Sequence, residues 1–247
     1  MRSVRVGWRW AARVVGGAIA GCLLVAAVVT GGLGAGPAVA EVSVLGLDVS
    51  GHQAGIDWAA VRSGGAQFAY VKASEGMGFV NPQFASQYNG SYQAGLIRGA
   101  YHFARPDISS GAAQATFFTA HGGGWSADGR TLPGAVDLEP APRGAECYGL
   151  SPSAMVAWIA DFAATYHGLT SRWPVIYTTS RWWAACTGGY SGFASQDPLW
   201  IAGATSPLPA GWGTYTAWQY AQGGTFPGDQ DIFNGSRAML RRFAARA

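Results

Sequence analysis

Residues 96–138 read LIRGAYHFARPDISSGAAQATFFTAHGGGWSADGRTLPGAVDL, and their pattern indicates the class of fold. Two short apolar runs, residues 96–103 and 132–138, have the composition of strands that are buried on both faces. Residues 111–121, which lie between these runs, are predicted to form a helix. A strand, a helix and a second strand in this order predict two parallel strands that are joined by a helical crossover.

The same alternation continues along most of the chain. Further strands are predicted at residues 42–49, 67–72, 173–178, 199–202 and 216–220, and further helices at residues 57–63, 82–94 and 151–166. After about residue 180 the helical pattern weakens, and loops rich in glycine and proline separate the strands. This order favours an α/β barrel whose last strands lack regular helices over a doubly wound sheet. In such a barrel, functional side chains gather at the C-terminal ends of the strands.

The first 40 residues are predicted to form a secretory signal peptide. Four arginines lie among residues 1–13 without an acid, an apolar run follows to about residue 33, and Ala38-Val39-Ala40 supplies a cleavage sequence. Cleavage there leaves residues 41–247 as a single secreted domain. Two alternatives are a membrane anchor retained through residues 14–35 and a lipid anchor at Cys22, because Ile19-Ala20-Gly21-Cys22 is similar to a lipidation sequence.

The charge of the chain gives no indication of nucleic-acid binding. The chain has 16 Lys and Arg and 13 Asp and Glu; four of the arginines lie in the predicted signal peptide, which leaves 12 basic and 13 acidic residues. The four histidines are dispersed without short-range partners, so no metal ion or other cofactor is expected. We expect a monomer.

Two cysteines, Cys147 and Cys186, remain outside the predicted signal peptide. A pair of cysteines in an exported chain predicts a disulfide that braces two loops and takes no part in chemistry. Two free, buried thiols are the alternative.

A pair of acids follows the strand predicted at residues 132–138. Asp137 and Glu139 are two residues apart, so in an extended chain they share one face, with backbones about 6.6 Å apart at ~3.3 Å per residue. Two neighbouring carboxylates in an apolar strand disfavour ionisation of one, and the protonated partner can act as a general acid. Glycoside hydrolysis requires such a pair. A solvated pair of acids at a loop entrance is the alternative.

Short motifs occur in a fixed order from residue 42 to residue 243: GLDVSGHQ at 46–53, IDW at 56–58, FAYVKASEG at 68–76, GAYHF at 99–103, DLE at 137–139, IYT at 176–178, LWIA at 199–202, WQY at 218–220 and DQDIFNG at 229–235. In this order they resemble the Chalaropsis-type lysozymes, glycoside hydrolase family 25. The resemblance implies a modified TIM-like barrel of five β/α units followed by β-strands that lack regular helices.

The resemblance also implies an activity. It implies a secreted N-acetylmuramidase, or lysozyme, that cleaves the β-1,4 bond between N-acetylmuramic acid and N-acetylglucosamine in bacterial peptidoglycan. Glu139 would be the general acid/base, and Asp137 would assist the N-acetyl group of the substrate. A glycosidase acting on another N-acetylated glycan such as chitin, and a non-catalytic glycan-binding barrel, are the alternative functions.

Two further aspartates match the family by position. Asp48 matches the aspartate of the opening strand, and Asp229 matches the aspartate near the C-terminus. Asp231 departs from the family pattern, which often has another polar residue there. Either Asp229 or Asp231 could therefore face the site, and the spacing to the Phe233-Asn234-Gly235 motif favours Asp229.

The stereochemical outcome is open at this stage. The spacing of about 6.6 Å between the two backbones suggests inversion by the two-acid rule, whereas the resemblance suggests retention through the N-acetyl group. We favour the second mechanism. Candidate sugar contacts, each with core packing or a structural ion pair as its alternative, are Tyr101, Tyr177, Trp200, Trp218 and Glu75.

Overall fold

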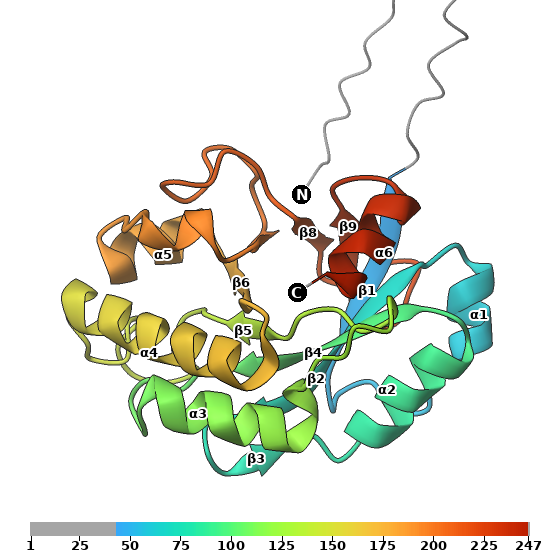
Figure 1. The fold of residues 1–247 in the computed structure, drawn as a ribbon, viewed down its shortest axis with the longest axis horizontal. Helices are drawn as coiled ribbons and strands as arrows, with labels where there is room; N and C mark the ends of the chain where they lie inside the picture. Colours follow the sequence, from blue (N-terminus) through green and yellow to red (C-terminus); the bar gives the residue numbers. More distant parts are fainter. Residues whose placement is uncertain (1–42, 247) are drawn as a thin grey trace, which may run out of the picture. The chain divides into compact units, whose positions relative to one another are not determined.

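Eight strands close into a barrel in the computed structural model, which describes residues 43–246 (Figure 1). Neighbouring strands pair in the order β1-β9-β8-β7-β6-β5-β4-β2, and the pairing of β1 with β2 closes the ring. A short strand, β3 (Phe79–Val80), adds to β2 outside the ring. The barrel strands are β1 (Val44–Val49), β2 (Phe68–Glu75), β4 (Ile97–Phe103), β5 (Ala135–Asp137), β6 (Val175–Thr178), β7 (Leu199–Ala202), β8 (Ala217–Ala221) and β9 (Asp229–Phe233).

The direction of pairing separates β9 from the other barrel strands. The strands from β1 through β2, β4, β5, β6 and β7 to β8 pair in parallel, whereas β9 runs antiparallel to both β8 and β1. The C-terminal ends of the parallel strands therefore meet the beginning of β9 at one end of the barrel. Helix α6 follows β9 and lies at the other end.

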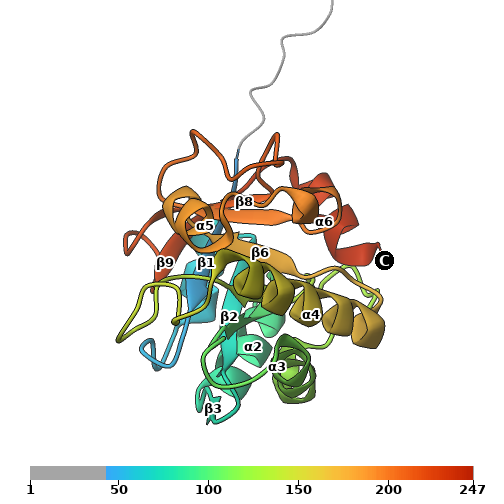
Figure 2. The same ribbon diagram turned by 90° about the vertical axis from the view of Figure 1, so that its left-hand side faces the viewer.

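Helices follow the first five of these parallel strands and none lies between β7 and β9 in the described chain. This order confirms the expected five β/α units followed by β-strands. The helices are α1 (Trp58–Ser63), α2 (Phe84–Gln93), α3 (Gly111–Phe118), α4 (Pro152–Thr170), α5 (Ser180–Thr187) and α6 (Arg237–Ala245), with a π-helical turn at Thr119–Gly123 and a 3-10 turn at Gly192–Ser195. In Figure 2, α3 and α4 lie side by side on the outside of the barrel.

Hydroxyl and carboxylate side chains fix the starts of most helices. Ser151, the residue before α4, accepts a hydrogen bond from the backbone N–H of Ala154, and Ser110 does the same for α3. Such caps satisfy backbone donors that have no partner inside the helix.

Helix α5, helix α6 and strand β9 were not predicted. The helical pattern does not end near residue 180, because α5 covers residues 180–187 and buries Trp182 and Trp183. Strand β9 lacks an apolar alternation because it begins with Asp229, Gln230 and Asp231.

Helix α6 covers the barrel end at which the parallel strands begin. Leu240 and Ala244 pack in a buried cluster with residues such as Phe68 and Val175 from the starts of strands. Trp125 and Arg172 each donate a side-chain hydrogen bond to a carbonyl of this helix. The opposite end is therefore the open one. The predicted signal peptide lies outside the described residues, as do the alternative membrane anchor and the alternative lipid anchor at Cys22. Within residues 43–246, no helix has the length and apolar character needed to cross a membrane.

Candidate active site

The open end of the barrel holds a polar pocket. Its volume is about 130 Å³, and a larger cavity of about 450 Å³ adjoins it through the shared residues Tyr101, Asp137 and Glu139. Side chains reach the smaller pocket from most strands of the barrel. Its lining residues are Asp48, Tyr101, Asp137, Glu139, Tyr177, Trp200, Gln219, Gln222 and Asp229.

All four predicted catalytic acids therefore line one pocket, although they lie up to 181 residues apart in the chain. The barrel explains how they meet. Asp48 and Asp229 are direct cross-strand partners on β1 and β9, and Asp137 ends β5. Since side chains alternate along a strand, Glu139 projects to the same side as Asp137 two residues earlier.

Asp137 and Glu139 form the acid pair of this pocket. Asp137 is buried, with 6% of its surface exposed, and its Oδ1 atom has no hydrogen-bond partner in residues 43–246. Burial, and then the charge of Glu139, raise the pKa of Asp137 well above its usual range. Burial also raises the pKa of the half-buried Glu139, while the Lys72 ammonium opposes this rise. Burial and the charge of Glu139 therefore favour a proton on one of the two carboxyls, which is what a general acid requires.

Gln219 links three of the polar residues at the pocket. Its Nε2 atom donates to Asp48 Oδ2 at 2.8 Å and to Asp229 Oδ2 at 3.1 Å, and its Oε1 atom accepts the Tyr177 hydroxyl at 2.8 Å. Gln219 lies within the WQY motif, but no role was predicted for it. The sequence gives no signal for this role, because the partners of Gln219 lie on other strands.

Asp231 lies beneath the pocket. It is fully buried and accepts a hydrogen bond of 2.9 Å from Trp200 Nε1. Its other oxygen, Oδ2, has no hydrogen-bond partner among residues 43–246. Burial raises the pKa of Asp48 to about 7, and burial and then the charge of Asp48 raise the pKa of Asp231 well above its usual range.

Residues 229 and 231 consequently both face the barrel interior, as residues two apart on a strand do. Asp229 is half-buried and lines the pocket, whereas Asp231 is absent from the pocket lining. The structure thus places the favoured residue, Asp229, at the pocket and Asp231 one layer deeper.

Three of the predicted sugar-contacting residues line the pocket. Tyr101, Tyr177 and Trp200 close its side and floor, and the Trp200 ring stacks on Tyr70 with ring centres 4.7 Å apart. Trp200 is only 2% exposed, so it serves as a floor rather than as an open platform for a sugar ring.

The structure does not bring the other two candidates, Trp218 and Glu75, to the pocket. Trp218 follows the inward-facing Ala217 and therefore points outward, where its Nε1 atom donates to the Gly203 carbonyl at 2.7 Å. Glu75 is held in ion pairs with Lys72 at 2.8 Å and Arg105 at 3.6 Å, which agrees with the alternative of a structural ion pair. Lys72 itself lines the adjoining cavity.

The predicted disulfide between Cys147 and Cys186 is confirmed. It joins the segment that follows Glu139 to helix α5. In the same segment, the Tyr148 hydroxyl donates to the carbonyl oxygen of Glu139 at 3.1 Å. The bridge therefore braces the loop that carries the acid. Residues 43–246 contain no group of His, Cys, Asp and Glu side chains arranged to hold a metal ion.

Known proteins are similar to this chain in sequence and in fold. The family model described as glycosyl hydrolases family 25 matches residues 47–229. Lysozyme M1 of Streptomyces globisporus is 49% identical over 227 residues, which cover 86% of this chain and 77% of that protein. The N,O-diacetylmuramidase of Chalaropsis sp is 44% identical over 209 residues, 82% of this chain and 99% of that protein.

A solved structure has the same fold as this chain. The muramidase from Acremonium alcalophilum superimposes with a TM-score of 0.80 at 54% identity, covering 82% of this chain and 99% of that one. The residues that the family model matches, 47–229, span all the residues that line the polar pocket.

Proposed function

This chain belongs to the glycosyl hydrolases family 25 and is a glycoside hydrolase, and we propose that it is an N-acetylmuramidase, a lysozyme, in which Glu139 is the general acid/base. Its substrate is bacterial peptidoglycan, cut at the β-1,4 bond between N-acetylmuramic acid and N-acetylglucosamine. The observation that carries this proposal is the buried carboxyl pair of Asp137 and Glu139 at the open end of the barrel. The names of its relatives do not favour action on chitin or a non-catalytic role.

In the proposed reaction, Glu139 donates its proton to the glycosidic oxygen as the bond from that oxygen to C1 breaks. The carbonyl oxygen of the 2-acetamido group of the substrate forms a bond to C1 from the opposite face, and Asp137 accepts the acetamide N–H. Glu139, now a carboxylate, takes a proton from the water that then attacks C1 and releases the acetamide oxygen. The product keeps the β configuration.

Substrate binding changes which carboxyl of the pair is protonated. In the free protein, burial favours the proton on Asp137. A hydrogen bond from the acetamide N–H to Asp137 stabilises its charged form and lowers its pKa. The proton is then held by Glu139, which is the less buried of the two and the one that must donate it.

The remaining acids support the positive charge that develops at C1. Asp48 and Asp229 line the same pocket, and Gln219 holds both at hydrogen-bond distance. Fixed negative charge in a pocket from which water is largely excluded stabilises such a transition state more than it would in water.

We further propose that residues 1–40 are a signal peptide and that residues 41–247 act outside the cell as one monomeric domain. The basic and apolar regions followed by Ala38-Val39-Ala40 support export. The disulfide between Cys147 and Cys186 suits an oxidising compartment.

Glu139→Gln tests the assignment of the acid. The change keeps the shape of the side chain and removes the titrating proton, so turnover of purified peptidoglycan should fall about 10²-fold or more. Glu146→Gln is the matched control, because Glu146 lies in the same loop and is ion-paired with Arg181 on the surface. Turnover by the control should remain near that of the unchanged protein. Near-normal turnover by Glu139→Gln, with both variants folded, would remove Glu139 from the role.

A further inference from the structure

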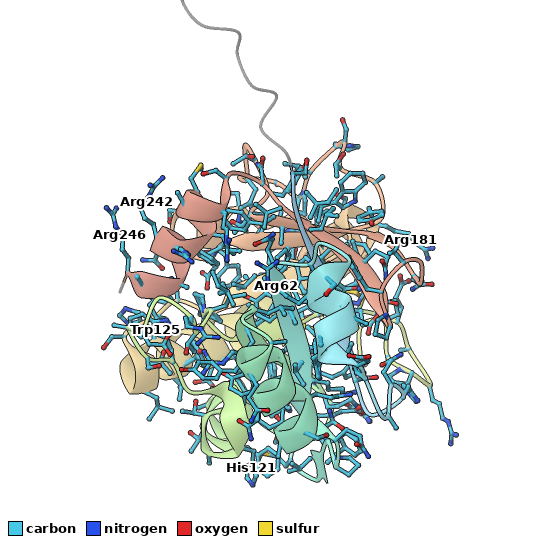
Figure 3. The ribbon with its side chains drawn as sticks, turned by 90° about the vertical axis from the view of Figure 1, so that its right-hand side faces the viewer. Arg62, His121, Trp125, Arg181, Arg242 and Arg246 are labelled. Carbon is cyan, nitrogen blue, oxygen red and sulfur yellow. A yellow bond between two sulfur atoms is a disulfide. The ribbon has the colours of Figure 1, made fainter. Side chains whose placement is uncertain are left out.

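A second cavity lies at the closed end of the barrel, remote from the acid pair. It has a volume of about 510 Å³ and is bounded by the start of β4, by residues 128–130 and by helix α6. Its charged residues are Arg130, Arg237, Arg241, Arg242 and Asp128, and we refer to these five as the basic pocket. Figure 3 shows Arg242 at this helix, with Arg246 next to it at the edge of the molecule.

The single acid of the basic pocket already has partners. Asp128 Oδ2 lies 3.5 Å from the Arg98 guanidinium and accepts the Thr131 hydroxyl at 3.0 Å. None of the four arginines of the basic pocket forms an ion pair with another described residue. The pocket therefore presents four cations whose charge is uncompensated within residues 43–246.

The spacing of these cations is unfavourable in the absence of an anion. Arg237 and Arg241 are four residues apart on α6, so their side chains are neighbours on the helix surface, and like charges at this spacing destabilise a helix. Burial, and then the charges of Arg241 and Arg62, lower the pKa of Arg237. Arg130 stacks on the ring of Tyr92 at 3.7 Å, which fixes the direction of its guanidinium. A bound anion would relieve the repulsion between these side chains.

We propose that the basic pocket binds the phosphate groups of an anionic alditol-phosphate polymer attached to the bacterial wall, of the wall teichoic acid type. Guanidinium groups match phosphate oxygens in shape and charge, and several guanidinium groups close together suit a ligand that carries phosphates at regular intervals. The proposal rests on the proposed function, because it supposes that the enzyme works on bacterial walls.

The position of the basic pocket allows the polymer and a glycan strand to bind at the same time. The arginines lie at the end of the barrel opposite the acid pair, so a polymer held there leaves the catalytic pocket free for a glycan strand. A protein that holds one component of the wall remains at high local concentration near the other component. The chain would thereby gain wall affinity from α6.

Arg237→Gln combined with Arg241→Gln tests the proposal. The probe is purified poly(ribitol phosphate), with binding measured by calorimetry at low and high salt. The double variant should bind about 10-fold more weakly at low salt, and the dependence of log Kd on log salt should fall by about two, because two phosphate contacts are lost. The matched control is Arg143→Gln combined with Arg181→Gln, which removes the same charge from exposed positions away from the basic pocket. Arg181 lies on the other side of the molecule in Figure 3.

Hydrolysis of two wall preparations separates this proposal from the proposed function. On walls that retain the polymer, the α6 double variant should be slower than the unchanged protein, and the gap should vanish on walls stripped of phosphate by hydrofluoric acid. Failure of the unchanged protein to cut stripped walls would contradict the proposed function, while binding of the purified polymer would still support the basic pocket. Equal losses in the two double variants, absent binding of the polymer, or preference for phosphatidylglycerol vesicles over the polymer would each overturn the proposal.

Discussion

At the scale of single residues, the acids at the open end of the barrel differ in burial, and this difference supports the roles that we propose for them. Both Asp137 and Glu139 line the two adjoining cavities, but Asp137 is buried and has an oxygen without a partner in the described chain, whereas Glu139 is half-buried. The first is suited to fix a group of the substrate, and the second to exchange protons with a leaving oxygen and with water. The proposed role of Asp137 can therefore be tested separately from that of Glu139.

Asp137→Asn should lose rate while it keeps ground-state affinity. The hydrogen bond between Asp137 and the acetamide strengthens as charge develops at C1, so its loss mainly raises the barrier. We expect kcat on peptidoglycan fragments to fall about 10²-fold or more while Kd, measured on the inactive Glu139→Gln background, changes little. A large loss of affinity at unchanged kcat would show that Asp137 only binds substrate.

NMR of the first product formed by the unchanged protein should show the β-anomer, and an initial α-anomer would contradict the assistance of the N-acetyl group.

Asp231→Asn tests the raised pKa of Asp231. An asparagine can accept the Trp200 N–H as the aspartate does, so it imitates the protonated aspartate without titrating. The pKa values of Asp48 and Asp231 are both raised in the folded chain, to about 7 for Asp48. The folded state therefore binds more protons than the unfolded state, and this contribution to stability is complete below about pH 4 and is lost as the pH rises toward 7.

Thermal unfolding measured from pH 4 to pH 8 checks this sign. The Asp231→Asn variant should lose less of its Tm than the unchanged protein as the pH rises, because one buried carboxyl no longer ionises. His102, whose pKa burial lowers to about 4, contributes in the opposite direction in both proteins and cancels in the comparison. Parallel Tm curves for the two proteins would contradict the raised pKa of Asp231.

At the scale of elements, the segment between β5 and α4 depends on covalent and polar contacts. The disulfide from Cys147 to Cys186 spans 39 residues and fixes this segment to α5. Replacing both cysteines by serine should lower the free energy of unfolding by roughly 2–4 kcal/mol, through the larger freedom of the unfolded chain. Denaturant unfolding of the two proteins, without reductant, measures the difference. An unchanged midpoint would show that the bridge does not stabilise the fold.

The same scale shows which elements the sequence can predict. Strands from 44 to 49 and from 199 to 202, and helix α4, have apolar patterns that match burial on the faces where they pack. Strand β9 has polar residues at 229 and 231 because they face the pocket and its floor, so function overrides the apolar pattern that predicts a strand. Helix α5 has only eight residues, too few to show a helical period before the next loop.

Some residues of the site can be predicted from the sequence, and others cannot. Asp48, Asp137, Glu139 and Asp229 lie at strand ends and in family motifs, and the structure gathers them in one pocket. The structure places Trp218 outside the pocket, and the sequence could not show this, because β8 has an apolar or aromatic residue at both 217 and 218. Gln219 required the three-dimensional structure, since its partners Asp48 and Asp229 lie on other strands.

At the scale of the whole molecule, opposite charges gather at the two ends of the barrel. The open end holds the carboxyls of Asp48, Asp137, Glu139 and Asp229, and the closed end holds the basic pocket. The total charge after residue 40 is nearly balanced. The distribution of charge over the surface therefore determines which partners the molecule attracts. One end is suited to a neutral glycan that becomes positive during reaction, and the other to a polyanion.

The identity of the bond that is cut shows whether the protein is an N-acetylmuramidase. The purified protein should be incubated with peptidoglycan of defined structure, and the products reduced with borohydride and analysed by mass spectrometry. Cleavage as an N-acetylmuramidase creates a new reducing end on N-acetylmuramic acid, so every new reduced terminus should be the alditol of that sugar. Reduced termini derived from N-acetylglucosamine, or the absence of new termini, would contradict the claim.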